Sequence, residues 1–275
     1  MRKDIIKQKV KEGYAKIART GASCCPGSSC CGSNNAKTIS KTVGYTEKEL
    51  NMVPEASNLG LGCGNPIALA SLKKGETVLD LGSGAGFDVF LAAEKVGKTG
   101  RVIGVDMTPE MIKRAKENAC KGNYTNVEFR LGEIEKLPVD NESIDVIISN
   151  CVINLSIDKQ EVFKEAFRVL KPGGRLMVSD LVLLRDLPEA IKKSIEAYIG
   201  CLAGATMKNQ YIEFIKKAGF KKIEILSQDT YPIEAMANDV TVKAVMDNSS
   251  LEKKDIKEIE NSVSSIKIYA LKKET

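Results

Sequence analysis

The sequence predicts an α/β protein built on a doubly wound, mostly parallel sheet of seven strands. Short apolar, β-branched segments recur along the chain, helical patterns lie between them, and a glycine-rich turn follows the first segment. At 275 residues the chain is long enough for one such domain with a small addition. Its 43% hydrophobic and 28% charged residues are ordinary for a globular protein.

The predicted strands are short and rich in β-branched residues, as buried parallel strands are. The first five are expected at residues 77–81, 102–106, 127–131, 144–149 and 175–179. Helices are expected between them at about 87–96, 109–121 and 159–170. The sequence KPGG at 171–174 predicts a turn before the fifth strand. Two more strands, at about 220–226 and 265–271, follow a helical region at 188–218 and complete the sheet.

An N-terminal extension precedes the sheet. Apolar residues within 2–19 are spaced as on one face of a helix. Residues 20–35, which contain CCPGSSCC, are rich in Gly, Ser and Asn and are expected to form a loop. Thr46 followed by Glu49 predicts a capping box at the start of a short helix. The glycine-punctuated segment 57–66 is expected to be a second loop.

Charge and composition exclude several classes of partner. The net charge is +5, from 41 basic and 36 acidic residues, and no dense basic block occurs. Only 5% of the residues are aromatic and Trp is absent, so we expect no nucleic-acid partner. No apolar run is long enough to span a bilayer, and the basic N-terminus lacks the apolar stretch of a secretory signal. We therefore expect no membrane partner and a cytoplasmic location, where thiols stay reduced.

The chain contains eight cysteines and no histidine. In a reducing compartment such cysteines more often serve catalysis or metal binding than a disulfide framework. A structural zinc site usually pairs cysteines two to four residues apart, which the adjacent doublets of CCPGSSCC fit poorly, so zinc is the less favoured interpretation. The absence of histidine removes the commonest general base.

The sequence VLDLGSGAG at 78–86 places three glycines between a predicted strand and a predicted helix. Asp106 ends the next strand, where a carboxylate can accept both ribose hydroxyls of an adenosine ligand. A pyrophosphate-binding turn usually has its third glycine one position later, and Asp80 is awkward beside a pyrophosphate but suits a cationic amino-acid group. A cofactor-free domain with the same turns is the alternative.

Three scattered cysteines fall near the same edge of the sheet. Cys151 follows the fourth strand, at the carboxyl edge where ligands bind in open α/β folds. Cys63 lies in the loop before the sheet, and Cys201 lies in the helical region after the fifth strand. Each of them alone could be a small buried hydrophobe, and Cys120 is expected to be inert. Together they offer thiolates, the natural ligands of a soft, thiophilic centre.

The glycine motif resembles motif I of class I S-adenosylmethionine methyltransferases. With NLGLGCGNP (58–66), SNCVINL (149–155) and GCLAGA (200–205), it resembles the arsenite methyltransferase family over about residues 10–230. The resemblance implies a class I, Rossmann-like fold and transfer of methyl groups from S-adenosylmethionine to thiol-bound As(III), giving mono- and dimethylated arsenicals. Because As(III) carries a lone pair, it can attack the sulfonium methyl group without a base.

The resemblance also implies the site residues. Cys63, Cys151 and Cys201 match the arsenic ligands, and a cysteine of the N-terminal loop, Cys30 or Cys31, matches a redox-cycling cysteine. We take Cys31 as that residue, although the doublets leave Cys24 and Cys25 open as well. The donor-binding residues implied by the resemblance are Asp80, Gly82, Ser83, Gly84, Gly86, Asp106, Met107, Glu133, Ile134 and Asn150. Of these, Asp80 and the glycines would hold the methionine moiety, Asp106 the ribose, and Glu133 with Ile134 the adenine.

The implied substrate is arsenite or its thiol conjugate, and the implied partner is a thiol reductant, thioredoxin or glutathione. The expected regions are an N-terminal helix and cysteine-rich loop (1–60), the donor-binding domain (61–182), and arsenic-covering helices with the last strands (183–275). A methyltransferase of a quinone or another small molecule and a non-catalytic, thiol-based metalloid-binding protein are the alternative functions. Antimonite or bismuth is a chemically reasonable alternative acceptor, because both are thiophilic.

Overall fold

The computed structural model describes residues 3–20, 32–187, 189–192, 201–230, 259 and 261–274. At its centre lies one seven-stranded sheet in the order β3-β2-β1-β4-β5-β7-β6. The strands are Thr77–Leu81 (β1), Arg101–Asp106 (β2), Val127–Leu131 (β3), Ile144–Asn150 (β4), Leu170–Leu183 (β5), Lys221–Thr230 (β6) and Val263–Leu271 (β7). Neighbouring strands from β3 to β5 are parallel, whereas β7 is antiparallel to both β5 and β6. The predicted doubly wound, mostly parallel sheet is confirmed.

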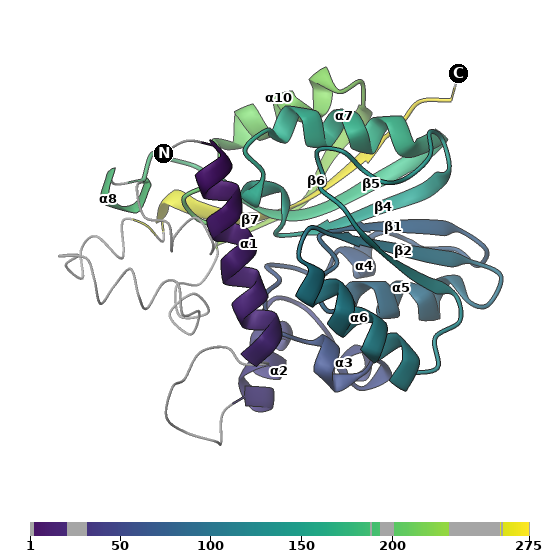
Figure 1. The fold of residues 1–275 in the computed structure, drawn as a ribbon. Coiled ribbons are helices and arrows are strands. Elements are labelled where there is room, and N and C mark those ends of the chain that lie inside the picture. Colours follow the sequence, from purple (N-terminus) through teal and green to yellow (C-terminus); the bar gives the residue numbers. More distant parts are fainter. Residues whose placement is uncertain are drawn as a thin grey trace.

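Helices cover both faces of the sheet (Figure 1). The described helices are Lys3–Thr20 (α1), Gly32–Thr42 (α2), Glu47–Met52 (α3), Pro66–Leu69 (α4), Phe87–Val96 (α5), Pro109–Lys121 (α6), Lys159–Val169 (α7), Glu189–Lys192 (α8) and Lys208–Lys217 (α10). Their ends follow from local chemistry. The predicted capping box of Thr46 and Glu49 opens α3, Pro109 occupies the first turn of α6, and the Asp158 side chain caps α7.

Two apolar layers hold the helices against the sheet. On one face Phe163 of α7 meets Tyr211 of α10 edge to face, with ring centroids 5.4 Å apart. On the other face Phe90 of α5 meets Phe129 of β3 with centroids 5.8 Å apart. Each fully buried ring of this size contributes roughly 2 kcal/mol through the hydrophobic effect. The carboxyl ends of β1, β2 and β4 are thereby fixed at one edge of the sheet.

Helix α1 packs beside this edge, along α6 (Figure 1). The Arg114 side chain of α6 donates through Nη1 to the carbonyl oxygen of Ala18 in α1, at 3.0 Å. Near the other end of α1, Lys7 forms an ion pair with Glu133, which lies just beyond β3. The N-terminal extension therefore forms one wall of the region into which the parallel strands open.

The structure corrects two local predictions. Residues 20–35 are not a loop throughout, because α2 begins at Gly32; its side chains Ala36 and Ile39 are buried, and packing against Gly60 outweighs the polar residues at the start. The predicted turn at 171–174 belongs to β5, since Gly173 and Gly174 form backbone hydrogen bonds with Lys272.

Other predictions stand only in part. The helical region predicted at 188–218 contains α8 and α10, with turns between them at 201–207.

The cysteines of CCPGSSCC lie outside the described residues, so the structure says nothing of Cys31. Over the part of the chain that is described, no helix is both long and apolar enough to cross a bilayer.

Candidate active site

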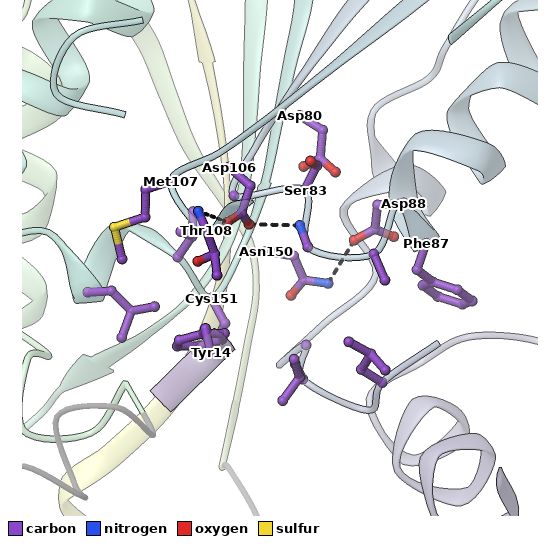
Figure 2. Close-up of a pocket in the computed structure, with 18 of the residues that line it drawn as sticks. Tyr14, Asp80, Ser83, Phe87, Asp88, Asp106, Met107, Thr108, Asn150 and Cys151 are labelled. Carbon is purple, nitrogen blue, oxygen red and sulfur yellow. Dashed lines mark hydrogen bonds between the residues drawn. The ribbon is translucent and has the colours of Figure 1, made fainter. Parts of the chain in front are cut away.

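The glycine-rich turn between β1 and α5 forms the floor of a pocket (Figure 2). Gly84 has a φ of +52°, and a Cβ atom added to it would meet nothing within 4 Å, so this part of the backbone faces open space. The neighbouring Ser83 hydroxyl is buried and has no hydrogen-bond partner among the described residues. An open backbone surface beside an unsatisfied buried hydroxyl fits a bound polar ligand.

Carboxylates dominate one side of this pocket. Asp106 accepts hydrogen bonds from the backbone N–H groups of Gly84 (3.0 Å) and Thr108 (2.8 Å), which fix its orientation. Burial raises the pKa of Asp80 well above its usual value, and the nearby charges of Asp88 and Asp106 raise it further. Burial also raises the pKa of Asp106. Three carboxylates crowded into one pocket favour a ligand that brings positive charge.

The pocket contains most of the residues expected to bind the methyl donor. Those that line it are Asp80, Gly82, Ser83, Gly84, Asp106, Met107, Ile134 and Asn150. Gly86 does not line it; a Cβ atom there would lie 2.8 Å from Phe90 and 2.9 Å from Phe129, so Gly86 serves the packing of the turn. Glu133 does not line it either, because its half-exposed side chain pairs with Lys7.

Among the lining residues that were not predicted, Tyr45 and Asp88 form a hydrogen-bond network with Asn150. Tyr45 donates its hydroxyl to Asp88 at 2.6 Å, and Asn150 donates to both the Tyr45 oxygen (2.9 Å) and Asp88 (3.0 Å). Burial raises the pKa of Asp88 to about 6 and that of Tyr45 well above 10.0. Asp88 ends the motif DLGSGAGFD and could have been recognised there. Tyr45 carried no signal, since it reaches the pocket from the segment before α3.

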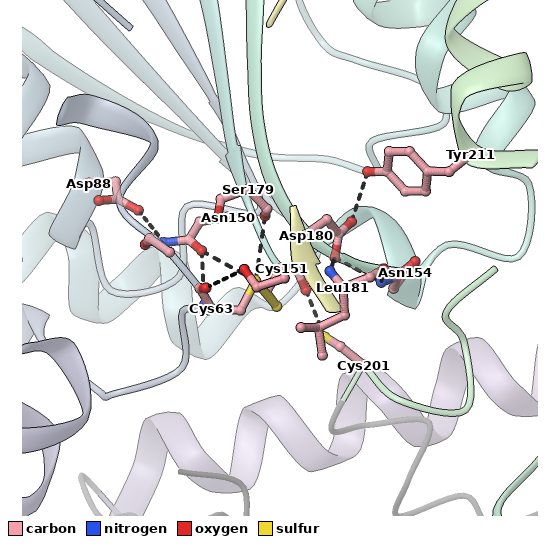
Figure 3. Close-up of a disulfide and its surroundings, with 12 residues drawn as sticks. Cys63, Asp88, Asn150, Cys151, Asn154, Ser179, Asp180, Leu181, Cys201 and Tyr211 are labelled. Atoms are coloured by element: carbon pink, nitrogen blue, oxygen red, sulfur yellow. Dashed lines mark hydrogen bonds between the residues drawn. A yellow bond between two sulfur atoms is a disulfide. The ribbon is translucent and has the colours of Figure 1, made fainter. Parts of the chain in front are cut away.

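The three scattered cysteines meet beside this pocket (Figure 3). Cys63 and Cys151 are both buried and joined by a disulfide, with Cα atoms 5.8 Å apart. The Sγ atom of Cys201 donates to the carbonyl oxygen of Cys151 at 2.7 Å. We expected reduced thiols at positions 63 and 151, but their Cα separation lies within the range that a disulfide requires. Cys120 is exposed on α6 and takes no part in the cluster.

A buried carboxylate that the sequence analysis missed adjoins this pair. One ligand atom each from Cys63, Cys151 and Asp180 all lie within 4.8 Å of one another. Asp180 accepts hydrogen bonds from Asn154 Nδ2 (2.8 Å), from its neighbour's backbone N–H and from the Tyr211 hydroxyl (2.9 Å). Burial raises the pKa of Asp180 to about 7. Its position near the carboxyl end of β5, next to Ser179, is the signal that could have identified it.

Comparisons with known proteins place this chain among methyltransferases. A family model described as a methyltransferase domain matches residues 72–219. An arsenite methyltransferase of Halobacterium salinarum is 47% identical over 81% of this chain and 59% of its own length, and one of Mus musculus is 34% identical over 84% and 62%. The chain thus spans about three fifths of these curated relatives.

Among solved structures, an arsenic(III) S-adenosylmethionine methyltransferase from Chlamydomonas reinhardtii is 30% identical. The match covers 88% of this chain and 74% of that one, with a TM-score of 0.62. Fold, pocket and sequence similarity therefore agree that this chain belongs to the arsenite methyltransferase family of class I S-adenosylmethionine methyltransferases.

Proposed function

We propose that this protein transfers methyl groups from S-adenosylmethionine to As(III) bound by thiols. The observation that carries the proposal is the position of Cys151, which lines the same pocket as the glycine-rich turn, Asp80 and Asp106. Cys63 and Cys201 lie next to Cys151. A thiophilic acceptor and a cationic donor would thus meet in one buried site.

The residues of the pocket fit the donor. When bound, S-adenosylmethionine supplies a methyl group on a positively charged sulfur. Asp80 would accept hydrogen bonds from the amino group of its methionine moiety, and Asp106 would accept hydrogen bonds from the ribose hydroxyls. Ile134 would pack against the adenine. The open surface over Gly84 leaves room for this ligand, and the Ser83 hydroxyl could satisfy its hydrogen bond there. The surrounding carboxylates favour a cation.

Reduction of the disulfide would release two thiols beside that of Cys201. As(III) arriving as a glutathione or other thiol conjugate would exchange its ligands for these cysteines, and each departing thiolate would take up one thiol proton. The arsenic lone pair would then form the carbon–arsenic bond as the carbon–sulfur bond breaks. The sulfur would keep that bonding pair and lose its charge. Holding both reactants in place can contribute on the order of 7 kcal/mol or more to such a reaction.

Methyl transfer formally oxidises arsenic to the pentavalent state, so two electrons must be returned. Two cysteine thiolates can supply them by forming a disulfide. Cys63 is suited to this role because it already has a disulfide partner, Cys151, at this site. We propose Cys31 as a further redox cysteine, and thioredoxin or glutathione as the reductant that reopens the bond. The need for reduced thiols favours the cytoplasm as the site of action.

The direct test is to incubate the purified protein with arsenite, methyl-labelled donor and a thiol reductant, and to separate the arsenic species. We expect labelled methylarsenicals from the wild type and from Cys120→Ser, the matched control with an exposed cysteine. Cys151→Ser and Cys201→Ser should lose activity. Full activity in either of these variants would refute the assignment of the arsenic site. Donor binding without any methylated arsenical would favour another acceptor, such as a quinone.

A further inference from the structure

The side-chain amide of Asn150 is fully engaged within the protein. Its Oδ1 accepts the backbone N–H of Cys63 at 3.0 Å. Its Nδ2 faces three acceptors, which are the carbonyl oxygen of Gly64 (2.8 Å), the hydroxyl of Tyr45 (2.9 Å) and the carboxylate of Asp88 (3.0 Å). Because both ends of the amide are used, Asn150 has little capacity left to bind the donor through this side chain. It bridges two parts of the site (Figure 3).

The loop around Cys63 is shaped to reach this amide. A Cβ atom on Gly62 would lie 2.6 Å from Asn150 Nδ2, and one on Gly64 would lie 1.8 Å from the Ser179 hydroxyl oxygen. Only glycine permits both approaches. Cys63 itself is 3% exposed and, unlike its neighbour Gly62, does not line the donor pocket. Cys63 therefore adjoins the donor pocket through Gly62 and Cys151 and is not itself part of the pocket wall.

The other end of the bridge does lie in the pocket. Tyr45 and Asp88 both line it, and one oxygen of Asp88 accepts a hydrogen bond from the Tyr45 hydroxyl. The other oxygen of Asp88 accepts a hydrogen bond from Asn150 (Figure 2). A cationic ligand in the pocket and the Asn150 amide would thus be attracted to the same carboxylate. A shift of the Asp88 carboxylate would therefore move the Asn150 amide, and the amide would move the backbone N–H of Cys63 that is bonded to it.

We propose that Asn150 is a positioning residue that couples occupancy of the donor pocket to the conformation of the Cys63 loop. A bound donor fixes Asp88 and Tyr45, which fix the amide of Asn150, and the amide then holds the backbone on both sides of the Cys63 sulfur. The Cys63 loop can open only when these hydrogen bonds break. The purpose of this coupling, to set an arsenic ligand once the donor is present, rests on the proposed function.

The coupling can be measured without arsenic. The protein is kept reduced with a phosphine, and the rate at which iodoacetamide alkylates Cys63 is followed by mass spectrometry with and without S-adenosylhomocysteine. We expect the ligand to slow alkylation of Cys63 at least fivefold in the wild type, a typical lower value for coupled sites. In Asn150→Ala, Cys63 should react faster without ligand, and the effect of the ligand should fall below twofold.

Matched variants separate coupling from loss of structure. Asn126→Ala removes an amide whose Nδ2 donates to the carbonyl oxygens of Ala93 and Gly97, outside the Asn150 network, and it should keep the wild-type ratio. Tyr45→Phe removes a single hydroxyl from the network and should give an intermediate ratio, which keeps the test decisive if Asn150→Ala does not fold. Calorimetry should show that S-adenosylhomocysteine still binds Asn150→Ala within about threefold of the wild-type affinity, because the amide is not a donor ligand.

A wild-type ratio in Asn150→Ala, or no effect of the ligand on Cys63 in the wild type, would overturn the proposal. Neither result would bear on arsenite methylation, which the labelled-donor assay tests separately. In that assay, the proposal further requires Asn150→Ala to lower kcat with little change in KM for the donor.

Discussion

Replacing Asp180 by asparagine should change how the stability of the protein depends on pH. Asp180 is completely buried, and its carboxylate accepts hydrogen bonds from Asn154, Leu181 and Tyr211. Asparagine has the same shape. Its oxygen can accept from Asn154 and Leu181, and its amide can donate to the Tyr211 hydroxyl oxygen. The substitution therefore removes the negative charge and keeps the local geometry.

The expected magnitude follows from the two pKa values. Burial raises the pKa of Asp180 from 3.8 to about 7, although its hydrogen bonds and the charge of Lys159 oppose this. Because the folded-state pKa is the higher one, the stability associated with the proton is fully present below about pH 4 and is lost as the pH rises through about 7. A tenfold change in proton affinity, which is one pKa unit, corresponds to a free-energy difference of about 1.4 kcal/mol. Ionisation of Asp180 should thus lower the free energy of unfolding of the wild type by up to about 4 kcal/mol relative to the protonated form.

The assay is urea unfolding of the reduced wild type and Asp180→Asn at several pH values. Between pH 5 and pH 8 the free energy of unfolding of the wild type should fall relative to that of the variant by roughly 2 to 3 kcal/mol. Asp140→Asn, at an exposed aspartate, is the matched control for the loss of one negative charge. A constant difference between wild type and Asp180→Asn over this range would mean that the Asp180 carboxyl is not destabilised by burial, and the reasoning would be wrong.

Three further substitutions test other parts of the structure. Gly64→Ala should lower the free energy of unfolding by about 3 kcal/mol, because the new methyl group would collide with the Ser179 hydroxyl, and adding Ser179→Ala should restore part of the loss in urea melts. Arg175→Met should cost about 3 kcal/mol, since it leaves Glu76 unpaired at a largely buried ion pair; the double variant with Glu76→Gln should cost less. Thr46→Ala should cost about 1 kcal/mol through loss of the capping box, and an equal stability would contradict that role.

The sheet could be predicted because its strands are local patterns. The run TVLDL at 77–81 is buried over most of its length, VEFRL at 127–131 alternates apolar with charged residues, and the helix that follows β2 carries a recognisable first turn. The same local pattern placed Asp106 at the end of a strand and hence in the pocket. Cys151 was placed at the carboxyl edge by the same argument. For these residues position along one element determines position in the site.

The rest of the site depends on contacts between distant segments. Tyr45 reaches Asp88 across 43 positions of sequence, and no property of the segment around Tyr45 indicates that contact. The Cys63–Cys151 pairing depends on the path of an irregular loop over the edge of the sheet. Glu133 was expected at the adenine, but it does not line the pocket and pairs instead with Lys7 of α1, which does. Such outcomes follow from tertiary packing, which residue patterns within one element do not contain.

The disulfide between Cys63 and Cys151 also has a consequence for the unfolded chain. Its two cysteines are 88 positions apart, and the covalent loop that they close contains β1 to β4 with the whole glycine-rich turn. Closing a loop of this length lowers the entropy of the unfolded state by an amount worth about 4 to 5 kcal/mol at 25 °C. The protein should therefore resist unfolding more strongly with this bond closed than after its reduction.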